Sequence, residues 1–135
     1  MTSTAPNSGP ALARWANEPF AYLTTTGRKS DAPHRIEIWF ALDDGALYLL
    51  SGGRDRSDWV RNLQANPNVS VELGTETFAG VAQVLAPDTP GDRHARELLV
   101  TKYRKGNDLE EWGRTSLPIM ITFASPAETN QEHRT

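Results

Sequence analysis

The sequence predicts a mainly β protein whose strands form a closed or nearly closed antiparallel barrel. Three observations lead to this fold class. Six short segments alternate apolar and polar residues, as half-buried strands do. Turn residues separate these segments, and helical periodicity is confined to two or three short stretches. Closure would also remove the exposed edges that a sheet of this size otherwise leaves.

The first half of the chain contains three of the expected strands, at residues 21–26, 34–42 and 46–51. In the second strand, alternation separates two faces. The apolar face carries Ile36, Ile38 and Phe40, and the mixed face carries Arg35, Glu37 and Trp39. The sequence Asp43-Asp44-Gly45 follows this strand. This sequence is typical of a tight hairpin, because Gly accepts a positive φ.

The second half mixes helices with strands. A helix is expected from Ser57 to Ala65, with Ser57 or Asp58 as its N-cap and Asn66-Pro67 as its end. The remaining elements are strands at 69–73, 78–86 and 117–124 and helices at about 92–104 and 109–113. We therefore expect one domain over residues 11–124, between a flexible arm at 1–10 and a flexible tail at 125–135.

Composition excludes several classes of function. The net charge of -3 argues against a general nucleic-acid binder. The absence of cysteine excludes disulfides, thiolate metal sites and a cysteine nucleophile. His34, His94 and His133 lie far apart in the sequence, so no metal site is expected. No apolar run approaches the roughly 20 residues that span a membrane, and no signal-peptide core is visible, so we expect a cytoplasmic protein.

Two basic turns are candidates for an anion site. The first is "GRKS" (27–30), and the second is "SGGRDRSDW" (51–59), which leads into a helix. Glycines let the backbone approach a ligand, the helix start offers free N–H groups, and Arg28, Lys29, Arg54 and Arg56 supply charge. The alternative is two ordinary surface turns, with the arginines paired to Asp31, Asp55 and Asp58.

Trp39 is the candidate for a flat ligand. Alternation places it on the polar face of its strand, where an aromatic side chain can stack on a planar ring. The alternative is burial beneath a helix or against a second subunit.

Several motifs occur in a specific order: "LTTTGRKS", "LYLLSGG", "DWVRNLQANPNVSVELG", "VTKY" and "SLPIMI". From about residue 20 to residue 122 the chain thereby resembles the deazaflavin (F420)-dependent nitroreductase family. The resemblance implies a six-stranded antiparallel split β-barrel with two to four short helices, related to the flavin-binding pyridoxamine-phosphate-oxidase-like fold.

The resemblance also implies an oxidoreductase that uses reduced coenzyme F420. Hydride would pass to an electrophilic small molecule such as an activated enone, a quinone or a nitro compound. Two alternatives remain open. The first is the same barrel with FMN as its cofactor, and the second is a non-catalytic protein that binds a deazaflavin, a flavin or a lipid. The row of cations favours F420, because its phosphate and glutamate tail is long and anionic.

Site residues carried over from the family line a cofactor groove. They are Arg28, Lys29, Ser30, His34, Arg35, Glu37, Ser51, Gly52, Gly53, Arg54, Ser57, Asp58 and Trp59. Trp39 and Tyr103 are expected at the substrate. The proton donor is open between Tyr103, Ser51 and water. Many split barrels dimerise, so a homodimer is permitted but not required.

The chain departs from the family at four positions. Asp31 replaces a usual Gly, although Asp tolerates the left-handed backbone better than most residues. Glu37 replaces a frequent Pro. Gly106 and Leu109 stand where nitroimidazole-reducing members have aromatic residues, so activity on bulky nitroimidazoles is not expected.

Overall fold

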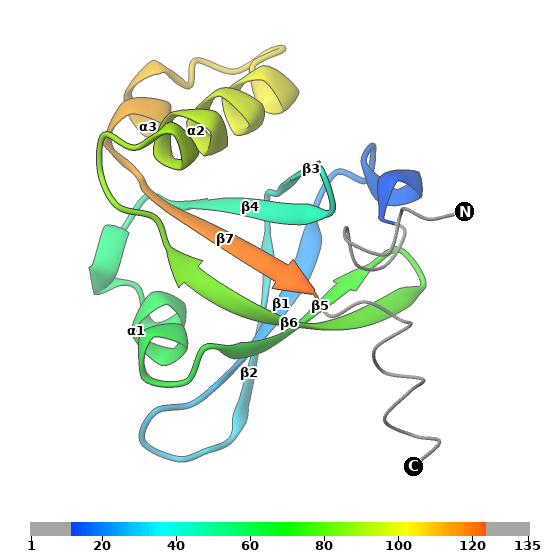
Figure 1. Ribbon diagram of the computed structural model, residues 1–135, viewed down its shortest axis with the longest axis vertical. Coiled ribbons are helices and arrows are strands. Elements are labelled where there is room, and N and C mark those ends of the chain that lie inside the picture. The colour runs from blue at the N-terminus through cyan, green and yellow to red at the C-terminus, as the bar shows by residue number, and fades with distance from the viewer. Residues whose placement is uncertain (1–11, 124–135) are drawn as a thin grey trace.

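The computed structural model describes residues 12–123, so the arm predicted at 1–10 and the tail at 125–135 lie outside the described residues. Seven strands form one antiparallel sheet: β1 (Ala21–Thr26), β2 (Pro33–Ile38), β3 (Ala41–Asp43), β4 (Ala46–Ser51), β5 (Asn68–Leu73), β6 (Glu76–Val84) and β7 (Leu117–Phe123). The three α-helices of this region are α1 (Asp58–Ala65), α2 (Pro90–Tyr103) and α3 (Glu110–Thr115), and two 3-10 turns are η2 (Ala13–Trp15) and η3 (Arg54–Arg56). The mainly β prediction is confirmed (Figure 1).

The predicted count of six strands is wrong. The expected strand 34–42 breaks at Trp39 and Phe40 into β2 and β3. The Phe40 amide donates to the Tyr103 hydroxyl at 3.0 Å, and its carbonyl accepts from Lys102 Nζ at 2.9 Å. Because α2 satisfies these backbone groups, Phe40 does not continue a strand ladder. Single-strand periodicity does not reveal such a break.

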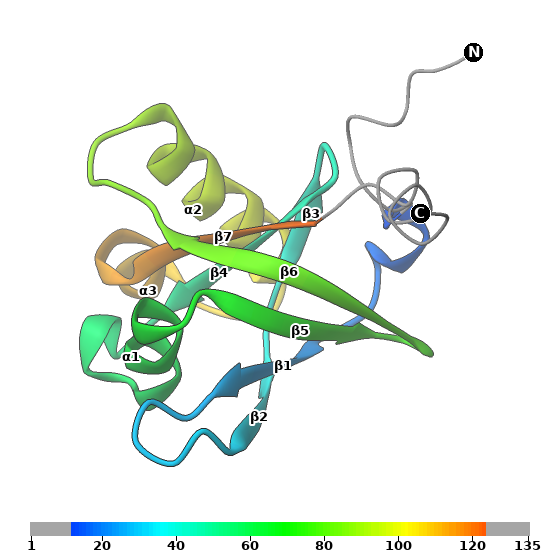
Figure 2. The ribbon, with the colours of Figure 1, turned by 60° about the horizontal axis from the view of Figure 1, so that its bottom comes forward.

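This break carries the chain from one end of the sheet to the other. The strand order is β2-β1-β5-β6-β7-β4-β3, so β2 and β3 are the two edges. The sheet curves into a half-barrel, and two residues of chain join its edges (Figures 1 and 2). Since β3 pairs only with Ala46, Leu47 and Tyr48, the end of β4 at Leu49–Ser51 has no strand of the described chain on that side. Besides the outer edges of β2 and β3, the end of β4 is therefore also free in this region.

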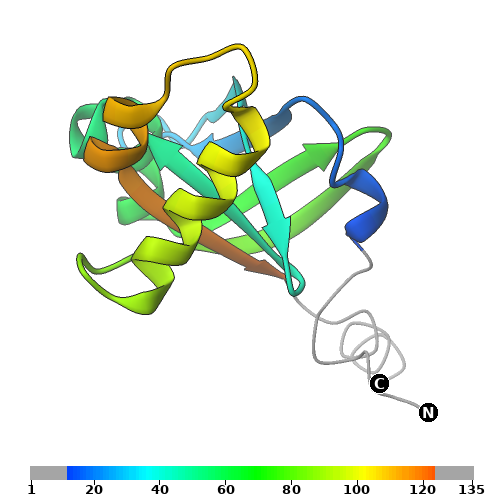
Figure 3. The same ribbon diagram turned by 90° about the horizontal axis from the view of Figure 1, so that it is seen from above.

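Strand β4 is buried on both faces, because two hydrophobic cores meet there. Leu47 and Leu49 belong to the core inside the curved sheet, which also receives Val60 and Leu63 of α1. The alternate residues Ala46, Tyr48 and Leu50 pack beneath α2, with Ala95 and Leu99. Figure 3 shows α2 lying across this strand.

The local signals place most boundaries within two residues. The turn after β3 has positive φ at Asp44 (54°) and Gly45 (79°), as the hairpin motif predicts. Helix α2 begins two residues earlier than expected, because Thr89 is its N-cap and Pro90 occupies the first turn. Proline is tolerated there, since that N–H has no partner within the helix.

Candidate functional site

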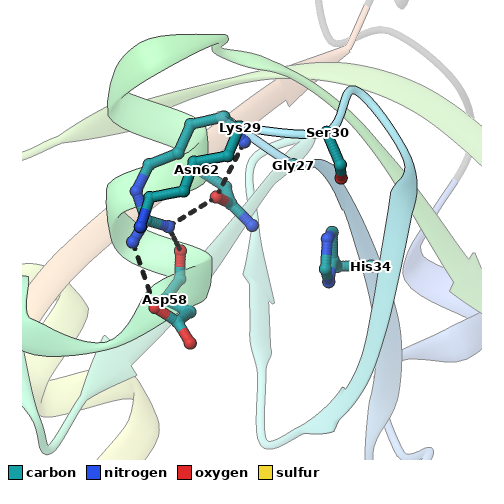
Figure 4. Close-up of a pocket in the computed structure, with 7 residues that line it drawn as sticks. Gly27, Lys29, Ser30, His34, Asp58 and Asn62 are labelled. Atoms are coloured by element: carbon teal, nitrogen blue, oxygen red, sulfur yellow. Dashed lines mark hydrogen bonds and ion pairs between the residues drawn. The ribbon is translucent and has the colours of Figure 1, made fainter.

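The first candidate site is a pocket between the β1–β2 turn and α1, which we call the basic pocket. Its volume is about 230 Å³, and its lining residues are Gly27, Arg28, Lys29, Ser30, His34, Asp58 and Asn62. Figure 4 shows the turn beside Asp58 and Asn62 of the helix, with the Ser30 side chain pointing toward His34. All of these except Gly27 and Asn62 are predicted site residues, so the structure brings the GRKS turn and the start of α1 together.

Arg28 holds the turn against α1. Its Nη1 and its backbone amide both donate to Asn62 Oδ1, at 2.8 and 3.2 Å. Its Nη2 lies 3.2 Å from Asp58 Oδ1. The pairing of arginine with Asp58 that the sequence left open therefore exists. It neutralises the Arg28 charge, whereas Lys29 is exposed and has no ion pair or hydrogen bond to another described residue.

Asn62 is a site residue that the sequence reasoning missed. It is 3% exposed, and its Nδ2 donates to Thr25 Oγ1 of β1 at 3.2 Å. It joins the strand, the turn and the helix through one amide. Its signal in the sequence is a polar residue between Val60 and Leu63 on the inward stripe of α1.

The turn between β1 and β2 depends on two backbone positions. A Cβ on Gly27 would lie 2.6 Å from His34 Nε2 and 2.9 Å from Ser30 Oγ, so a larger residue there would displace these two side chains. Asp31 has φ of 61°, and its amide donates to the Gly27 carbonyl at 2.9 Å. The expectation that Asp31 tolerates the left-handed region is confirmed.

The second candidate site is the aromatic pocket, of about 270 Å³, lined by Glu37, Ile38, Trp39, Leu50 and Trp112. The Trp39 and Trp112 rings are nearly perpendicular, at 86° and 5.5 Å between centroids. Tyr103 of α2 stacks on Trp39 at 4.2 Å and 2°. Trp39 is therefore covered by Tyr103 of α2 on one ring face, as the burial alternative expected, and it also lines a pocket. Trp112 was missed, since its position on α3 gives no hint of strand β2.

Tyr103 contacts the aromatic pocket through its ring, which stacks on Trp39, while its hydroxyl is bonded to the backbone. The hydroxyl oxygen accepts from the Phe40 amide at 3.0 Å and lies 2.9 Å from the Pro19 carbonyl and 3.0 Å from the Phe40 carbonyl. Burial raises the pKa of Tyr103, and the bond to Phe40 opposes this rise. The phenol is thus neutral at physiological pH and occupied by backbone groups.

The glycine-rich turn after β4 is held by two serines. Ser51 is 2% exposed; its Oγ donates to the Arg54 carbonyl at 2.9 Å and lies 3.1 Å from Ser57 Oγ. A Cβ on Gly53 would lie 2.5 Å from Ser57 Oγ. Ser57 is the N-cap residue of α1, as predicted, but its side chain makes no capping hydrogen bond. The first N–H groups of α1 therefore have no side-chain cap.

Eight predicted residues line neither pocket: Tyr103 and the turn residues Ser51, Gly52, Gly53 and Ser57, and also Arg35, Arg54 and Trp59. Arg35 is on the opposite face of β2 from His34, where it pairs with Glu72 at 3.0 Å and stacks on Tyr22. Trp59 packs against the main core. Arg54 donates to the Thr115 carbonyl at the end of α3. The side chains of these residues have structural contacts in this state of the protein.

The two pockets lie along the same strand. His34 of β2 lines the basic pocket, and Glu37 and Ile38 line the aromatic pocket. Three residues of strand span about 10 Å. On the other side, Leu50 lines the aromatic pocket and Asp58 the basic one, with the glycine-rich turn between them. One β-strand and one turn therefore border both pockets.

Within residues 12–123, no group of three or more His, Cys, Asp or Glu side chains is placed to hold a metal ion. No helix of this region has both the length and the apolar character to cross a membrane.

Comparisons with known proteins identify the family of this chain. The profile of the F420H(2)-dependent quinone reductase family matches residues 2–123. An F420H(2)-dependent quinone reductase of Mycobacterium tuberculosis is 32% identical over 107 residues, which is 76% of this chain and 70% of that protein.

Solved structures agree as well. An F420-H2 dependent reductase has 26% identity and a TM-score of 0.62 over 77% of this chain and 93% of its own. A candidate pyridoxamine 5'-phosphate oxidase from Listeria innocua shares the fold, at 20% identity and a TM-score of 0.61, over 83% and 89% of the two chains. The resemblance drawn from the sequence motifs is confirmed: the chain belongs to the F420H(2)-dependent quinone reductase family.

Proposed function

We propose that the protein is an F420H2-dependent reductase that passes a hydride to a flat electrophilic acceptor, with a quinone as the first candidate. Its family makes coenzyme F420 the cofactor. The observation that carries the proposal is that a basic pocket and an aromatic pocket lie along the same strand. This arrangement suits a ligand with a planar ring at one end and an anionic tail at the other.

The basic pocket suits the anionic part of the cofactor. Lys29 is exposed and unpaired within the described chain, and Ser30 lines the same pocket. The first N–H groups of α1 carry the positive end of the helix dipole. Because Arg28 is paired with Asp58, we assign the main phosphate contact to Lys29 and a supporting role to Arg28.

The aromatic pocket suits the ring and the acceptor. The edge of β2 and the edge of β4 at Leu49–Ser51 offer backbone N–H and C=O groups that no strand of the described chain pairs. A flat heterocycle with alternating carbonyl and N–H groups can pair with such an edge, as an added strand does. When bound, the reduced deazaflavin supplies the hydride, and Trp39 and Trp112 orient the acceptor beside it.

The proton that follows the hydride is assigned to water. The Tyr103 hydroxyl contacts the Phe40 and Pro19 backbone, and Ser51 Oγ is buried in its turn. In this arrangement neither group is free to bond a developing oxyanion. We therefore propose that Tyr103 supports Trp39 from behind and that Ser51 shapes the turn.

A binding and turnover experiment tests the proposal. Oxidised F420 and FMN are titrated separately into the protein while ring fluorescence is followed. F420 is expected to bind in the micromolar range and more tightly than FMN, and F420H2 to be oxidised when menadione is added. Tight F420 binding without turnover on any quinone or enone would support a non-catalytic carrier. Binding of neither cofactor would contradict the proposal.

A homodimer is a separate proposal. The outward side chains of β6 are exposed, and Val81, at 48% exposure, is the exposed large hydrophobic residue of the described chain. This uncovered face can pack against a second copy. Light scattering after size exclusion, at several protein concentrations, distinguishes a dimer from a monomer of 14.9 kDa.

A further inference from the structure

The bend between β2 and β3 places the Phe40 backbone against the end of α2, directly after Trp39. Three polar groups of the chain compete there for one tyrosine hydroxyl. The Phe40 amide donates to Tyr103 Oη, and the carbonyls of Phe40 and Pro19 both lie within 3.0 Å of it. A phenol has one proton, so Tyr103 donates to only one of these two carbonyls at a time.

Lys102 resolves this competition. Its Nζ donates to the Phe40 carbonyl at 2.9 Å and lies 3.6 Å from the centroid of the Phe40 ring. With the Phe40 carbonyl satisfied by Lys102, the Tyr103 proton is available to Pro19. An unpaired carbonyl at this part-buried position would cost free energy. Lys102 thus lets one hydroxyl bridge two segments of chain, before β1 and after β2.

The hydroxyl in turn fixes the Tyr103 ring. That ring stacks on Trp39 at 4.2 Å with an angle of 2° between the planes. Trp39 lines the aromatic pocket and contacts Trp112 edge to face. A continuous set of contacts therefore leads from the lysine to the wall of the pocket, and each contact is a hydrogen bond or a ring contact.

We propose that Lys102 is a positioning residue for the acceptor site, acting through the Phe40 carbonyl and Tyr103 on the orientation of Trp39. This inference rests on the proposed function, because it assigns the aromatic pocket to the acceptor. Lys102 itself does not line that pocket. It lines a separate pocket of about 360 Å³ on the other side, with Leu42 and Leu98.

Two substitutions separate hydrogen bonding from packing. Lys102→Met keeps the length of the aliphatic stem and removes the donor. Lys102→Arg keeps a donor, and the adjacent 360 Å³ pocket has room for the larger guanidinium. Tyr103→Phe removes the hydroxyl and keeps the ring. Lys105→Met is the matched control, because Lys105 is exposed in the loop after α2.

The position of Trp39 is read without cofactor or acceptor. The four tryptophans are labelled with 5-fluorotryptophan, and their fluorine signals are assigned with single Trp→Phe variants. We expect Lys102→Met and Tyr103→Phe to move or broaden the Trp39 signal, Lys102→Arg to restore it, and the Trp59 signal to stay in place. An unchanged Trp39 signal in folded Lys102→Met protein would overturn the proposal. If Lys102→Met does not fold, Tyr103→Phe replaces it in the same comparison, and an unchanged Trp39 signal there has the same meaning.

Kinetics then test whether this position matters to the acceptor. The KM for menadione is expected to rise about 3- to 10-fold in Lys102→Met, the range that one typical hydrogen bond is worth, while the Kd for F420 stays constant. A shifted Trp39 signal with unchanged acceptor KM would overturn the role at the acceptor site. Failure of every variant and of the wild type to bind F420 would instead contradict the proposed function, and the fluorine result would still stand.

Discussion

At the scale of the residue, Lys29 is the more available of the two cations that line the basic pocket. It is exposed beside Ser30, whereas Arg28 next to it is held by Asp58 and Asn62. Lys29→Ala is therefore expected to weaken F420 binding by about 1–3 kcal/mol, the worth of a charge-assisted hydrogen bond, or about 5- to 150-fold in Kd. Fluorescence titration measures this change.

The control for this prediction is Lys105→Ala, which removes the same charge from an exposed loop outside both pockets. It should leave the Kd for F420 unchanged. If Lys29→Ala and wild type bind F420 with equal affinity, the GRKS turn is an ordinary surface turn and not part of the cofactor site.

Asp31 is a residue whose backbone role and charge can be separated. Its φ of 61° suits Asp or Asn, but its carboxylate lies on the turn that we assign to the phosphate. Asp31→Asn keeps the left-handed preference and removes the charge. The change should tighten F420 binding about 2- to 5-fold, the scale of exposed charge interactions, without altering the melting temperature.

Asp44→Asn is the matched control, because Asp44 has φ of 54° in the hairpin after β3, outside both pockets. It should change neither affinity nor melting temperature. Weaker F420 binding by Asp31→Asn would show that the carboxylate takes part in the site.

At the scale of the element, Asp92 and Arg96 attach α2 to its surroundings. The buried Asp92 carboxylate accepts from the Asp88 amide at 2.8 Å and from Arg96 Nε at 2.7 Å. Arg96 Nη1 donates to the Gly113 carbonyl of α3 at 2.9 Å. One ion pair therefore closes the first turn of α2 and holds α3, which carries Trp112 to the aromatic pocket.

Asp92→Ala is expected to lower the free energy of unfolding by about 1–3 kcal/mol, since it leaves the Asp88 amide and Arg96 without their partner. Urea unfolding measures the loss. Glu97→Ala on the exposed face of the same helix is the control and should cost little. A loss below about 0.5 kcal/mol in Asp92→Ala would contradict this account.

Because the Asp92 carboxylate is paired in the folded state, the free energy of unfolding is expected to depend on pH in the acid range. Burial raises the pKa of Asp92, but the Asp88 amide and Arg96 lower it, and the net shift is downward. A carboxylate whose pKa is lowered by folding stabilises the protein at pH values above its unfolded-state pKa. This stabilisation is lost as the pH falls through the folded-state pKa. The stability difference between wild type and Asp92→Asn should therefore narrow from neutral pH to about pH 3. A constant difference would contradict this linkage.

At the scale of the whole molecule, buried basic and phenolic groups predict how folding responds to alkali. Burial lowers the pKa of Lys102 to about 8, and the Glu18 carboxylate opposes this. Between pH 8 and the ordinary lysine value the unfolded chain binds more protons, so this group makes stability rise with pH. Burial also raises the pKa of Tyr48 and Tyr103 above 10.0, so that their contribution makes stability fall above that pH.

Urea unfolding at about pH 7.5, 9 and 10.5 checks this, with variants used to cancel the general effect of charge. Lys102→Met should remove part of the rise between the first two values, and Tyr103→Phe part of the fall toward the last. If the pH profile of Lys102→Met matches that of wild type, the lysine is not the titrating group.

The sequence by itself determined the features that neighbours along the chain control. The strand periodicity, the hairpin at Asp44-Gly45, the left-handed Asp31 and the helix from Ser57 all depend on contacts within a few residues. The order of the motifs determined the family, because motif order does not depend on how the chain folds. These signals also mark Lys29 and Trp39 as candidate site residues.

Only the tertiary structure decided which of these residues meet and which are already occupied. The expected strand 34–42 splits into β2 and β3 because Lys102 and Tyr103, more than sixty residues away, bind the Phe40 backbone. Asn62 neutralises no charge but fixes Arg28, and Trp112 reaches the pocket from α3. A pairing between distant residues depends on the packing of the whole sheet, which local propensity does not contain. For this reason the sequence could indicate candidate residues but not which of them contact one another.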